Sequence, residues 1–488
     1  MAKKDVIKRV ELIFLFVLLA FTAIFRAQVT DMPLDKNEGA YAYGAVRISQ
    51  GAVPYRDFFE HRPPMILYLY RAAFSAFGQT DRAVRYFTTV CAAAAAILIY
   101  ILARVAWRSA FIAMLASFFY VIYQNSFALG GLCADTAVFA QLPVLICLLL
   151  ACDRDSKYES VNFCASGFFA GIAVLTDLMT VFLAAAVVLY AAVYGGKNRM
   201  KNIAWFFAGC ISVPIASAAW AFFNGAQKQM FDGVFGYNWK AFAAALKGPR
   251  IPETTGYLAL FIYADILPCA AFIYSAWVFF KRKKDGVNFL LFCAAVSLCT
   301  GILAAPGAST EYYLALMPLA ALLSALLVRD IYALISSGTG PKKYAPVILG
   351  MFLVLNIAVI SKANNAVSVI SGGEYTKKIY YEERSMAREI AADSYGKPKK
   401  DNFVFAWPDM PAVYFMTGAK AASVYSYSYP LEILKNDKPK LIGALIDGRP
   451  SWAIMQKGTH QSYQAFLDNY YAKEAETKDL VLYRNILF

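Results

Sequence analysis

Acidic and basic side chains gather in one polar stretch, residues 30–85, of an otherwise apolar chain. Near its start stands Asp35-Lys36-Asn37-Glu38, with two carboxylates three residues apart at a predicted helix start. A carboxylate in such a place can act as a general base that deprotonates a hydroxyl. The same spacing fits a capping box, in which Asp35 is the N-cap and Glu38 its reciprocal partner. Both interpretations are open, and the pair can serve both purposes.

A second group, Glu60-His61-Arg62, joins an acid, an imidazole and a guanidinium directly before two prolines. We expect Arg62 to hold a phosphate at the N-terminus of the helix that follows. His61 could bind a metal, steady a leaving phosphate or cap that helix. One imidazole and one acid are too few to predict a metal site, although carboxylates could bind Mg²⁺ or Mn²⁺, so no cofactor is predicted and a divalent metal stays open. Nearby, Arg56-Asp57 is either part of an anionic headgroup site or a local ion pair.

Further candidates open apolar segments elsewhere in the chain. Asp135 starts one such segment and Glu311-Tyr312 starts another. An acid at a helix start can simply interact with the helix dipole, or it can line the same cleft as Glu38. Asp177, in a break between two apolar runs, has the same two interpretations. Lysines and aromatic residues at 228–247 either cover a lipid-linked ligand or form a solvated loop.

Composition identifies the elements that must position these residues. Of 488 residues 59% are hydrophobic and 16% charged, and the mean hydropathy is +0.48. Because several apolar runs are long enough to cross a bilayer, we predict a polytopic α-helical membrane protein with about eleven transmembrane helices. The expected spans are 9–27, 84–106, 109–129, 134–152, 162–176, 178–195, 202–222, 257–280, 287–305, 312–334 and 344–361. The net charge of +14 lies in clusters between these runs, as membrane topology would place it, so nucleic-acid binding is not expected.

Lysine and arginine clusters predict the orientation. They place the N-terminus in the cytoplasm of a cell whose inner membrane the chain spans, with residues 27–84 and the tail outside. In the first outside loop, 39–50 and 63–77 read as two helices too short to span, which we expect to lie at the membrane interface. Nine cysteines all fall in or beside apolar segments, where they read as packing residues.

Two domains are predicted: a transmembrane domain, 1–361, and an extracytoplasmic α/β domain, 362–488. In the tail, residues 373–392 and 463–471 have helical spacing. Alternating patterns predict strands at 402–407, 421–425, 441–446, 451–456 and 480–483.

The first-loop motifs resemble those of the GT-C membrane glycosyltransferases, in the branch of protein O-mannosyltransferases and lipid A aminoarabinose transferases. The segment Asn37-Glu38-Gly39-Ala40-Tyr41 is similar to the family's acidic pair followed by glycine and Tyr-Ala. The segment 54–64, PYRDFFEHRPP, is similar to its next motif. Weaker matches are Ala134-Asp135-Thr136, Glu311-Tyr312-Tyr313-Leu314 and residues 403–407. This resemblance implies a GT-C fold with its catalytic first loop at 27–84.

The resemblance also implies an inverting transfer of a sugar, a hexose or pentose, from a polyprenyl-phosphate donor to a lipid, glycan or protein acceptor on the outer face. Its site residues would be Glu38 and Asp35 as base, with Asn37, Tyr41, Arg56, Asp57, Glu60, His61, Arg62, Asp135, Glu311 and Tyr312 contacting substrates. Here the family's base position holds Asn37, and Asp177 stands where the family often has lysine.

These departures keep two other classes of function open. One is a non-catalytic homologue that binds a polyprenyl-linked sugar or a partner enzyme. The other is a transporter, which the scarcity of charge in the later spans and the lack of an inverted repeat disfavour. Membrane lipids are expected partners in every case.

Overall fold

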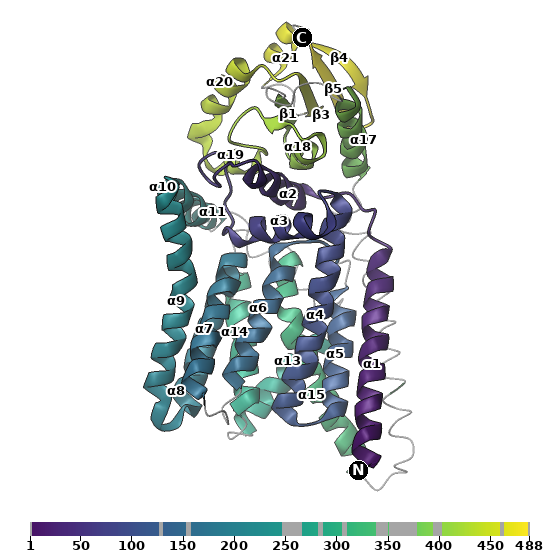
Figure 1. Ribbon diagram of the computed structural model, residues 1–488, viewed down its shortest axis with the longest axis vertical. Coiled ribbons are helices and arrows are strands. Elements are labelled where there is room, and N and C mark those ends of the chain that lie inside the picture. Colours follow the sequence, from purple (N-terminus) through teal and green to yellow (C-terminus); the bar gives the residue numbers. More distant parts are fainter. Residues whose placement is uncertain are drawn as a thin grey trace. The chain divides into compact units, whose positions relative to one another are not determined.

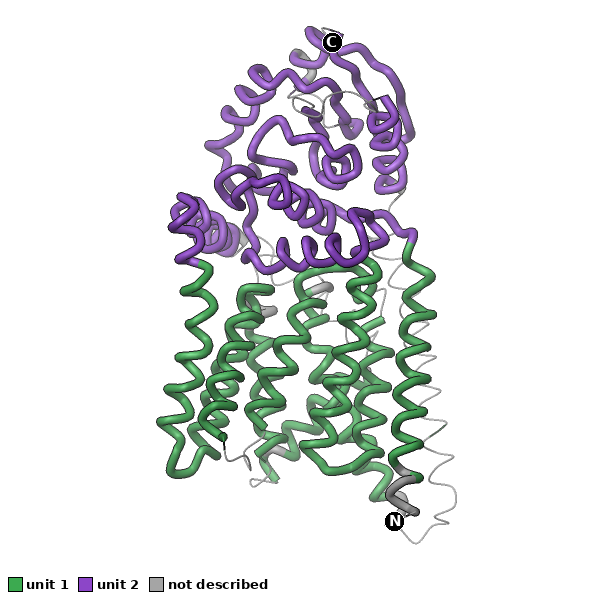
Figure 2. The backbone as a smooth tube through the Cα atoms, in the orientation of Figure 1, with its two compact units in different colours: residues 1–30, 85–217, 247–373 green, residues 31–84, 218–246, 374–488 purple. Residues whose placement is uncertain are grey.

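The computed structural model describes residues 2–125, 130–152, 158–245, 266–281, 286–304, 310–337, 350, 378–393, 403–458 and 463–486. Their contacts divide the chain into two units (Figure 2). Unit 1 comprises Met1–Thr30, Arg85–Ser217 and Lys247–Gly373, and unit 2 comprises Asp31–Val84, Ala218–Leu246 and Glu374–Phe488. The first loop is therefore grouped with the tail and not with the helices that flank it in sequence.

Unit 1 is a helical bundle whose long helices run side by side (Figure 1). Its elements, two of which extend a few residues into unit 2, are α1 (Ala2–Ala27), α4 (Asp81–Trp107), α5 (Ala110–Gln124), α6 (Thr136–Cys152), α7 (Glu159–Thr176), η1 (Leu178–Phe182), α8 (Leu183–Tyr194), η2 (Gly196–Asn198), α9 (Arg199–Phe223), α13 (Ile266–Lys281), α14 (Gly286–Ala304), η4 (Thr310–Leu316) and α15 (Met317–Ser337).

Among the described residues, 5 helices are long and apolar enough to cross a membrane: Lys8–Ala27, Asp81–Trp107, Glu159–Thr176, Gly196–Phe223 and Tyr312–Leu334. Shorter apolar helices coincide with further predicted spans, at Ala110–Gln124, Thr136–Cys152, Leu178–Tyr194, Leu267–Val278 and Gly286–Thr300. The predicted span 344–361 lies outside the described residues apart from Gly350. The number of crossings therefore stays a prediction, whereas the mostly helical character is confirmed.

The predicted break at Asp177 is confirmed. Its backbone is extended, and its carboxylate caps η1 by accepting a hydrogen bond from the Met179 amide at 3.0 Å. The predicted span 312–334 coincides with the apolar helical segment Tyr312–Leu334, whose first part, up to Leu316, is a 3₁₀ helix that α15 continues from Met317.

Two contacts join pairs of helices in unit 1. Arg104, near the end of α4, forms an ion pair of 3.1 Å with Glu11 of α1. The glycine that starts α14 packs on Tyr190 and Tyr194 at the end of α8. The N-terminus of α14 therefore lies against the C-terminal end of α8.

In unit 2, the first loop forms α2 (Lys36–Ser49) and α3 (Met65–Phe77). The same unit contains α10 (Gln227–Phe231), the π-helix η3 (Asp232–Tyr237) and α11 (Asn238–Ala245). Every α2 residue from Glu38 to Val46 is buried. The reason is that α3 packs on one side of α2 and the tail helix α18 (Pro411–Thr417) on another. The packing of α2 is thus defined by protein contacts, and the placement of 39–50 and 63–77 at the membrane interface stays a prediction.

Unit 2 also holds the tail, whose mixed five-stranded sheet has the order β2-β1-β3-β5-β4. Its strands are β1 (Phe403–Trp407), β2 (Lys420–Ala421), β3 (Trp452–Gln456), β4 (Tyr471–Glu476) and β5 (Leu480–Asn485). The first three run parallel, and β5 pairs antiparallel with β3 and β4. Around the sheet lie α17 (Lys378–Asp393), α18, α19 (Tyr429–Ile433), η8 (Lys435–Asp437), α20 (Lys438–Gly448) and α21 (Gln464–Tyr470). This confirms the predicted α/β tail.

Two strand predictions in the tail are wrong. Residues 441–446 lie inside α20, where Pro439 near the start and Arg449 in left-handed geometry at the end delimit a helix. Short apolar runs do not distinguish a strand from a buried helix turn. Of residues 421–425, only Ala421 is in a strand. Helix α18 and strand β4 were not predicted.

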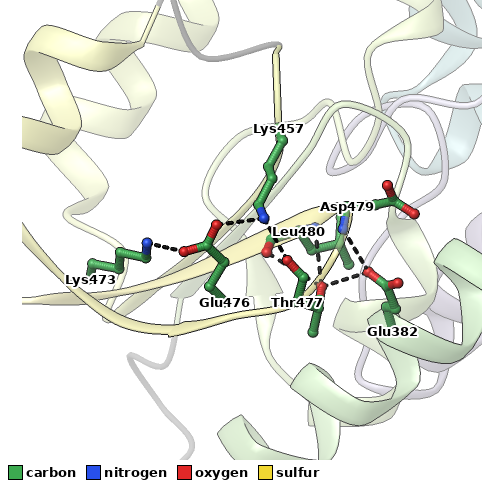
Figure 3. Close-up of polar contacts among 7 residues, drawn as sticks. All are labelled: Glu382, Lys457, Lys473, Glu476, Thr477, Asp479 and Leu480. Atoms are coloured by element: carbon green, nitrogen blue, oxygen red, sulfur yellow. Dashed lines mark hydrogen bonds and ion pairs between the residues drawn. The ribbon is translucent and has the colours of Figure 1, made fainter.

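The β4–β5 hairpin is fastened to α17 by polar contacts (Figure 3). Glu382 of α17 accepts hydrogen bonds from the Thr477 hydroxyl at 2.5 Å and from the Asp479 amide at 3.1 Å. Lys457, just after β3, donates to the Thr477 carbonyl at 2.6 Å and pairs with Glu476. These contacts attach the β4–β5 edge of the sheet to α17 and to the residue that follows β3.

Candidate functional site

The two acids at the start of α2 form the capping box. The Asp35 carboxylate accepts from the Glu38 amide at 2.8 Å, and Glu38 Oε2 accepts from the Asp35 amide at 3.1 Å. Both side chains are buried, with exposures of 6% and 0%. Asn37 lies between them in the first turn and is half-buried. Each acid uses one carboxylate oxygen for the cap.

Arg62 lies beside the same helix. Its guanidinium carbon is 5.8 Å from the centre of the Tyr41 ring. Tyr41 follows Glu38 by three residues, so the two side chains share a face of α2. Tyr41 is in turn held edge-on by Tyr70 of α3, with ring centres 5.5 Å apart. Unit 2 therefore brings together predicted site residues from both ends of the first-loop motif: two carboxylates and one cation.

Glu60 organises the turn that precedes α3. Its Oε1 accepts from the amides of His61 and Arg62 at 2.8 and 3.0 Å, and the side chain is 2% exposed. Burial raises the pKa of this carboxyl, while the two amides and Arg62 oppose that rise. Glu60 thus shapes the backbone that carries Arg62.

His61 is enclosed by aromatic residues from other parts of unit 2. Its Nδ1 lies 3.1 Å from the Tyr427 hydroxyl, and its ring centre is 5.1 Å from that of Tyr237. Its carbonyl accepts from the Asn238 side-chain amide at 2.8 Å. Burial, with a smaller contribution from Arg62, lowers the His61 pKa to about 3. The imidazole is therefore neutral near pH 7, and Arg62 supplies the positive charge of this segment.

The interpretation of Arg56-Asp57 as a local ion pair has direct support. The guanidinium contacts Asp57 at 2.8 Å and donates to the Asn224 carbonyl at 3.0 Å. This pairing lowers the pKa of Asp57. Asp57 also borders a groove of ≈ 500 Å³ that Arg47 and Lys420 line, at the opposite end of α2 from Asp35.

Sequence reasoning missed two acids of unit 2, Glu383 and Asp409. Glu383, on α17, is 2% exposed, and burial together with the negative charges of Asp409 and Asp35 raises its pKa well above the ordinary value. Asp409 precedes α18 and accepts from the Ser428 amide and hydroxyl, both at 2.9 Å. No local motif marks either acid, because Glu383 comes within electrostatic range of Asp35 and Asp409 only through tertiary packing.

Unit 1 holds the remaining candidates. The Thr136 hydroxyl lies 2.8 Å from Asp135 Oδ1 and 3.2 Å from Asp177 Oδ2, so it links these two acids. Both carboxylates are buried. Each acid was a candidate by itself in the sequence, and the structure of this unit brings the two together.

Tyr312 and Glu311 lie in η4. This 3₁₀ helix is fastened to α6 because the Gln141 amide donates to the Leu314 carbonyl at 2.9 Å. Tyr312 is half-buried. The role of Glu311 and Tyr312 as substrate contacts stays a prediction.

For a divalent metal, Asp35 and Glu38 offer carboxylate oxygens within 4.8 Å of each other. Mg²⁺ accepts such a pair when water supplies its other ligands, whereas zinc usually needs more protein ligands. His61 contributes its Nδ1 to Tyr427 instead. The described residues of unit 2 thus fit a weakly held hard cation better than zinc.

Comparisons with known proteins give a sequence relationship for part of the chain and a fold relationship for nearly all of it. Residues 61–222 match the family model described as dolichyl-phosphate-mannose-protein mannosyltransferase. The match begins at His61-Arg62, within the first-loop motif. A search of curated protein sequences found no match.

Solved structures share the fold over almost the whole chain. ArnT from Cupriavidus metallidurans, bound to undecaprenyl phosphate, matches with a TM-score of 0.67 and 12% identity, covering 96% of this chain and 98% of that one. Its apo form gives a TM-score of 0.63 at 13% identity, with 96% and 97% covered. The Archaeoglobus fulgidus oligosaccharyltransferase with a tethered acceptor peptide gives 0.55 at 13% identity, with 97% and 74% covered.

At these identities the structural matches establish the fold, and the family model adds a sequence relationship over one third of the chain. Together they confirm the resemblance predicted from the first loop. Over residues 61–222 the chain is similar to the dolichyl-phosphate-mannose-protein mannosyltransferases, and over almost its whole length it has an ArnT-like, mostly helical membrane-protein fold.

Proposed function

We propose that this protein transfers a sugar from a polyprenyl-phosphate donor to an acceptor hydroxyl on the outer face of the cytoplasmic membrane. One observation carries the proposal: Arg62 lies against Tyr41, one helical turn from Glu38 and its capping partner Asp35. A buried acid pair next to a cation suits a reaction in which a proton is removed at one end and negative charge develops at the other.

In this reaction Glu38 or Asp35 accepts the proton of the acceptor hydroxyl. The hydroxyl oxygen bonds to the sugar carbon, with inversion, while the bond from that carbon to the phosphate oxygen breaks. The bonding electrons leave with the polyprenyl phosphate. The Arg62 guanidinium stabilises the negative charge that develops on this phosphate. Arg62 accelerates the reaction only if it binds the departing phosphate more strongly than the intact donor.

Support for the donor comes from relatives. One solved ArnT structure contains undecaprenyl phosphate, and the archaeal oligosaccharyltransferase AglB was solved with a dolichol phosphate. The membrane orientation, with a cytoplasmic N-terminus and an outside tail, is part of the proposal and is supported by the lysine and arginine clusters between the apolar segments.

Binding of short-chain undecaprenyl phosphate to the purified protein in nanodiscs tests the proposal. A charge-assisted hydrogen bond is worth about 1.5–3 kcal/mol, so Arg62→Ala should weaken binding about 10- to 100-fold. Arg71→Ala removes the same charge from an exposed position on α3 and is the matched control, with unchanged affinity expected. Equal affinity of Arg62→Ala and wild type would refute the phosphate-binding role.

A non-catalytic homologue is the second candidate, and Asn37 is the observation that favours it. The amide stands at the second residue of α2, where the family has its base, and it cannot accept a proton. This alternative predicts donor binding that depends on Arg62 without release of polyprenyl phosphate. Turnover assays with the same donor and with membranes as the source of acceptor separate the two functions.

A further inference from the structure

The helical segment Gln227–Ala245, made of α10, η3 and α11, presents two faces of opposite character. On one face, Phe231, Phe235 and Trp239 recur every four residues and are 62%, 52% and 70% exposed. The rings of Phe231 and Phe235 contact each other, with centres 5.4 Å apart. Exposed aromatic side chains at this spacing form an apolar patch on one side of the segment. Such a patch marks a surface that contacts lipid or another protein.

The opposite face of the segment is buried and packs against the turn Glu60-His61-Arg62. A Cβ built on Gly233 would lie 2.6 Å from the Glu60 carbonyl oxygen, so only glycine permits this approach. Asn238 donates to the His61 carbonyl at 2.8 Å, and the Tyr237 ring lies 5.7 Å from that of Phe59. The segment is therefore rigidly joined to residues 59–61.

Chain connectivity determines what can cover the aromatic face. Helix α9 is one of the helices able to cross a membrane, and it ends in Phe222 and Phe223, which are 65% and 84% exposed. Only residues 224–226 separate it from α10, a reach of at most about 10 Å. The aromatic face therefore starts within about one headgroup layer of the end of a membrane span.

We propose that Phe231, Phe235 and Trp239 form an aromatic anchor that inserts into the interfacial region of the lipid bilayer and thereby holds the Glu60-His61-Arg62 turn at the membrane surface. Tryptophan and phenylalanine on one face of a short helix are suited to this depth, where rings meet both acyl chains and headgroups. Lys228, exposed one turn before Phe231, lies where a cation can reach lipid phosphates. The anchor does not depend on the proposed sugar transfer.

Tryptophan quenching in nanodiscs tests the anchor, with one full-length protein per disc. Subtracting the emission of Trp239→Phe from that of the wild type isolates Trp239, and subtracting Trp452→Phe isolates the buried Trp452 of β3 as a control. We expect the Trp239 emission to be lost with acyl-brominated phosphatidylcholine and to resist iodide in the buffer. Trp452 should resist both quenchers.

Quenching of Trp239 by iodide and not by brominated lipid would overturn the proposal. Protection from both quenchers would also overturn it, because it would mean that protein covers this face. A second protein copy is excluded as cover by the single-occupancy discs.

Hydrogen exchange of the same discs tests the link to the turn. Phe231→Gln with Phe235→Gln should increase exchange of the amides of Phe59, His61 and Arg62. Tyr381→Gln, which replaces an exposed aromatic residue of α17 (52% exposed), should not. Unchanged exchange in the double variant, with the quenching pattern also unchanged, would show that the aromatic face anchors nothing.

Discussion

Replacing Asp35 and Glu38 at the start of α2 by their amides distinguishes their role in capping the helix from their proposed role as the catalytic base. The capping box uses Asp35 Oδ1 and Glu38 Oε2 as acceptors for backbone amides. Asparagine and glutamine keep a carbonyl oxygen at these places, and both are favourable in a capping box. The double variant Asp35→Asn/Glu38→Gln should therefore retain the geometry of α2 while it removes every proton acceptor of the pair.

The expected magnitudes differ strongly for folding and for turnover. Two negative charges lost from a helix N-terminus cost about 0.3–1 kcal/mol each. A shift of that size lowers the unfolding temperature by only a few degrees. If one of the acids is the base, turnover should fall by a factor of about 10²–10⁴.

The assay follows release of undecaprenyl phosphate from a synthetic donor in membranes, together with thermal unfolding of the same preparations. Asp35→Ala/Glu38→Ala is the comparison for loss of the cap, since it should cost about 1 kcal/mol more in stability. The single amide variants then show which acid is the base. Wild-type turnover in the double amide variant would refute the assignment of the base to this pair.

Three further predictions concern the surroundings of this pair. Gly39→Ala should destabilise the protein by about 1–3 kcal/mol and reduce turnover, because its Cβ would lie 2.5 Å from the Ala412 amide nitrogen; Gly443→Ala, with open space in α20, should be neutral or stabilising in the same thermal assay. Glu383→Gln should flatten the fall in stability above pH 4.5, because burial raises the native pKa above that ordinary value and the native state then binds more protons than the unfolded one. His61→Gln should flatten the rise in stability between about pH 3 and 6.5, where the unfolded imidazole binds a proton that the native one, with its pKa of about 3, does not. Unchanged pH profiles of the free energy of unfolding would contradict the last two.

Local rules predicted much of the fold because they concern neighbours in sequence. Hydropathy located the long helices of unit 1, and the spacing of Asp35 and Glu38 predicted the capping box that the structure contains. The same rules failed at 441–446, where an apolar run of six residues fits a strand and a helix equally well.

Tertiary relationships could not be predicted in this way. Glu383 and Asp409 are hundreds of residues from Asp35 in sequence, and their types and spacing carry no motif. Tyr427, the partner of His61, lies in a run of alternating serine and tyrosine that gives no sign of which ring turns inward. Such residues require the packing of α17 and α18 against the first loop before they can be recognised.

Within unit 2, the tail makes direct hydrogen bonds to the first loop. The Tyr43 hydroxyl of α2 accepts from the Ala421 amide at 3.0 Å, and the Phe59 amide donates to the Val424 carbonyl at 2.8 Å. Both contacts place backbone of the tail directly against the loop that carries Glu38 and Arg62. Since buried polar groups require such partners, removing the tail would leave the loop with unpaired groups and an exposed apolar face. The tail therefore acts as a wall of the candidate site, and the loop depends on it for its conformation.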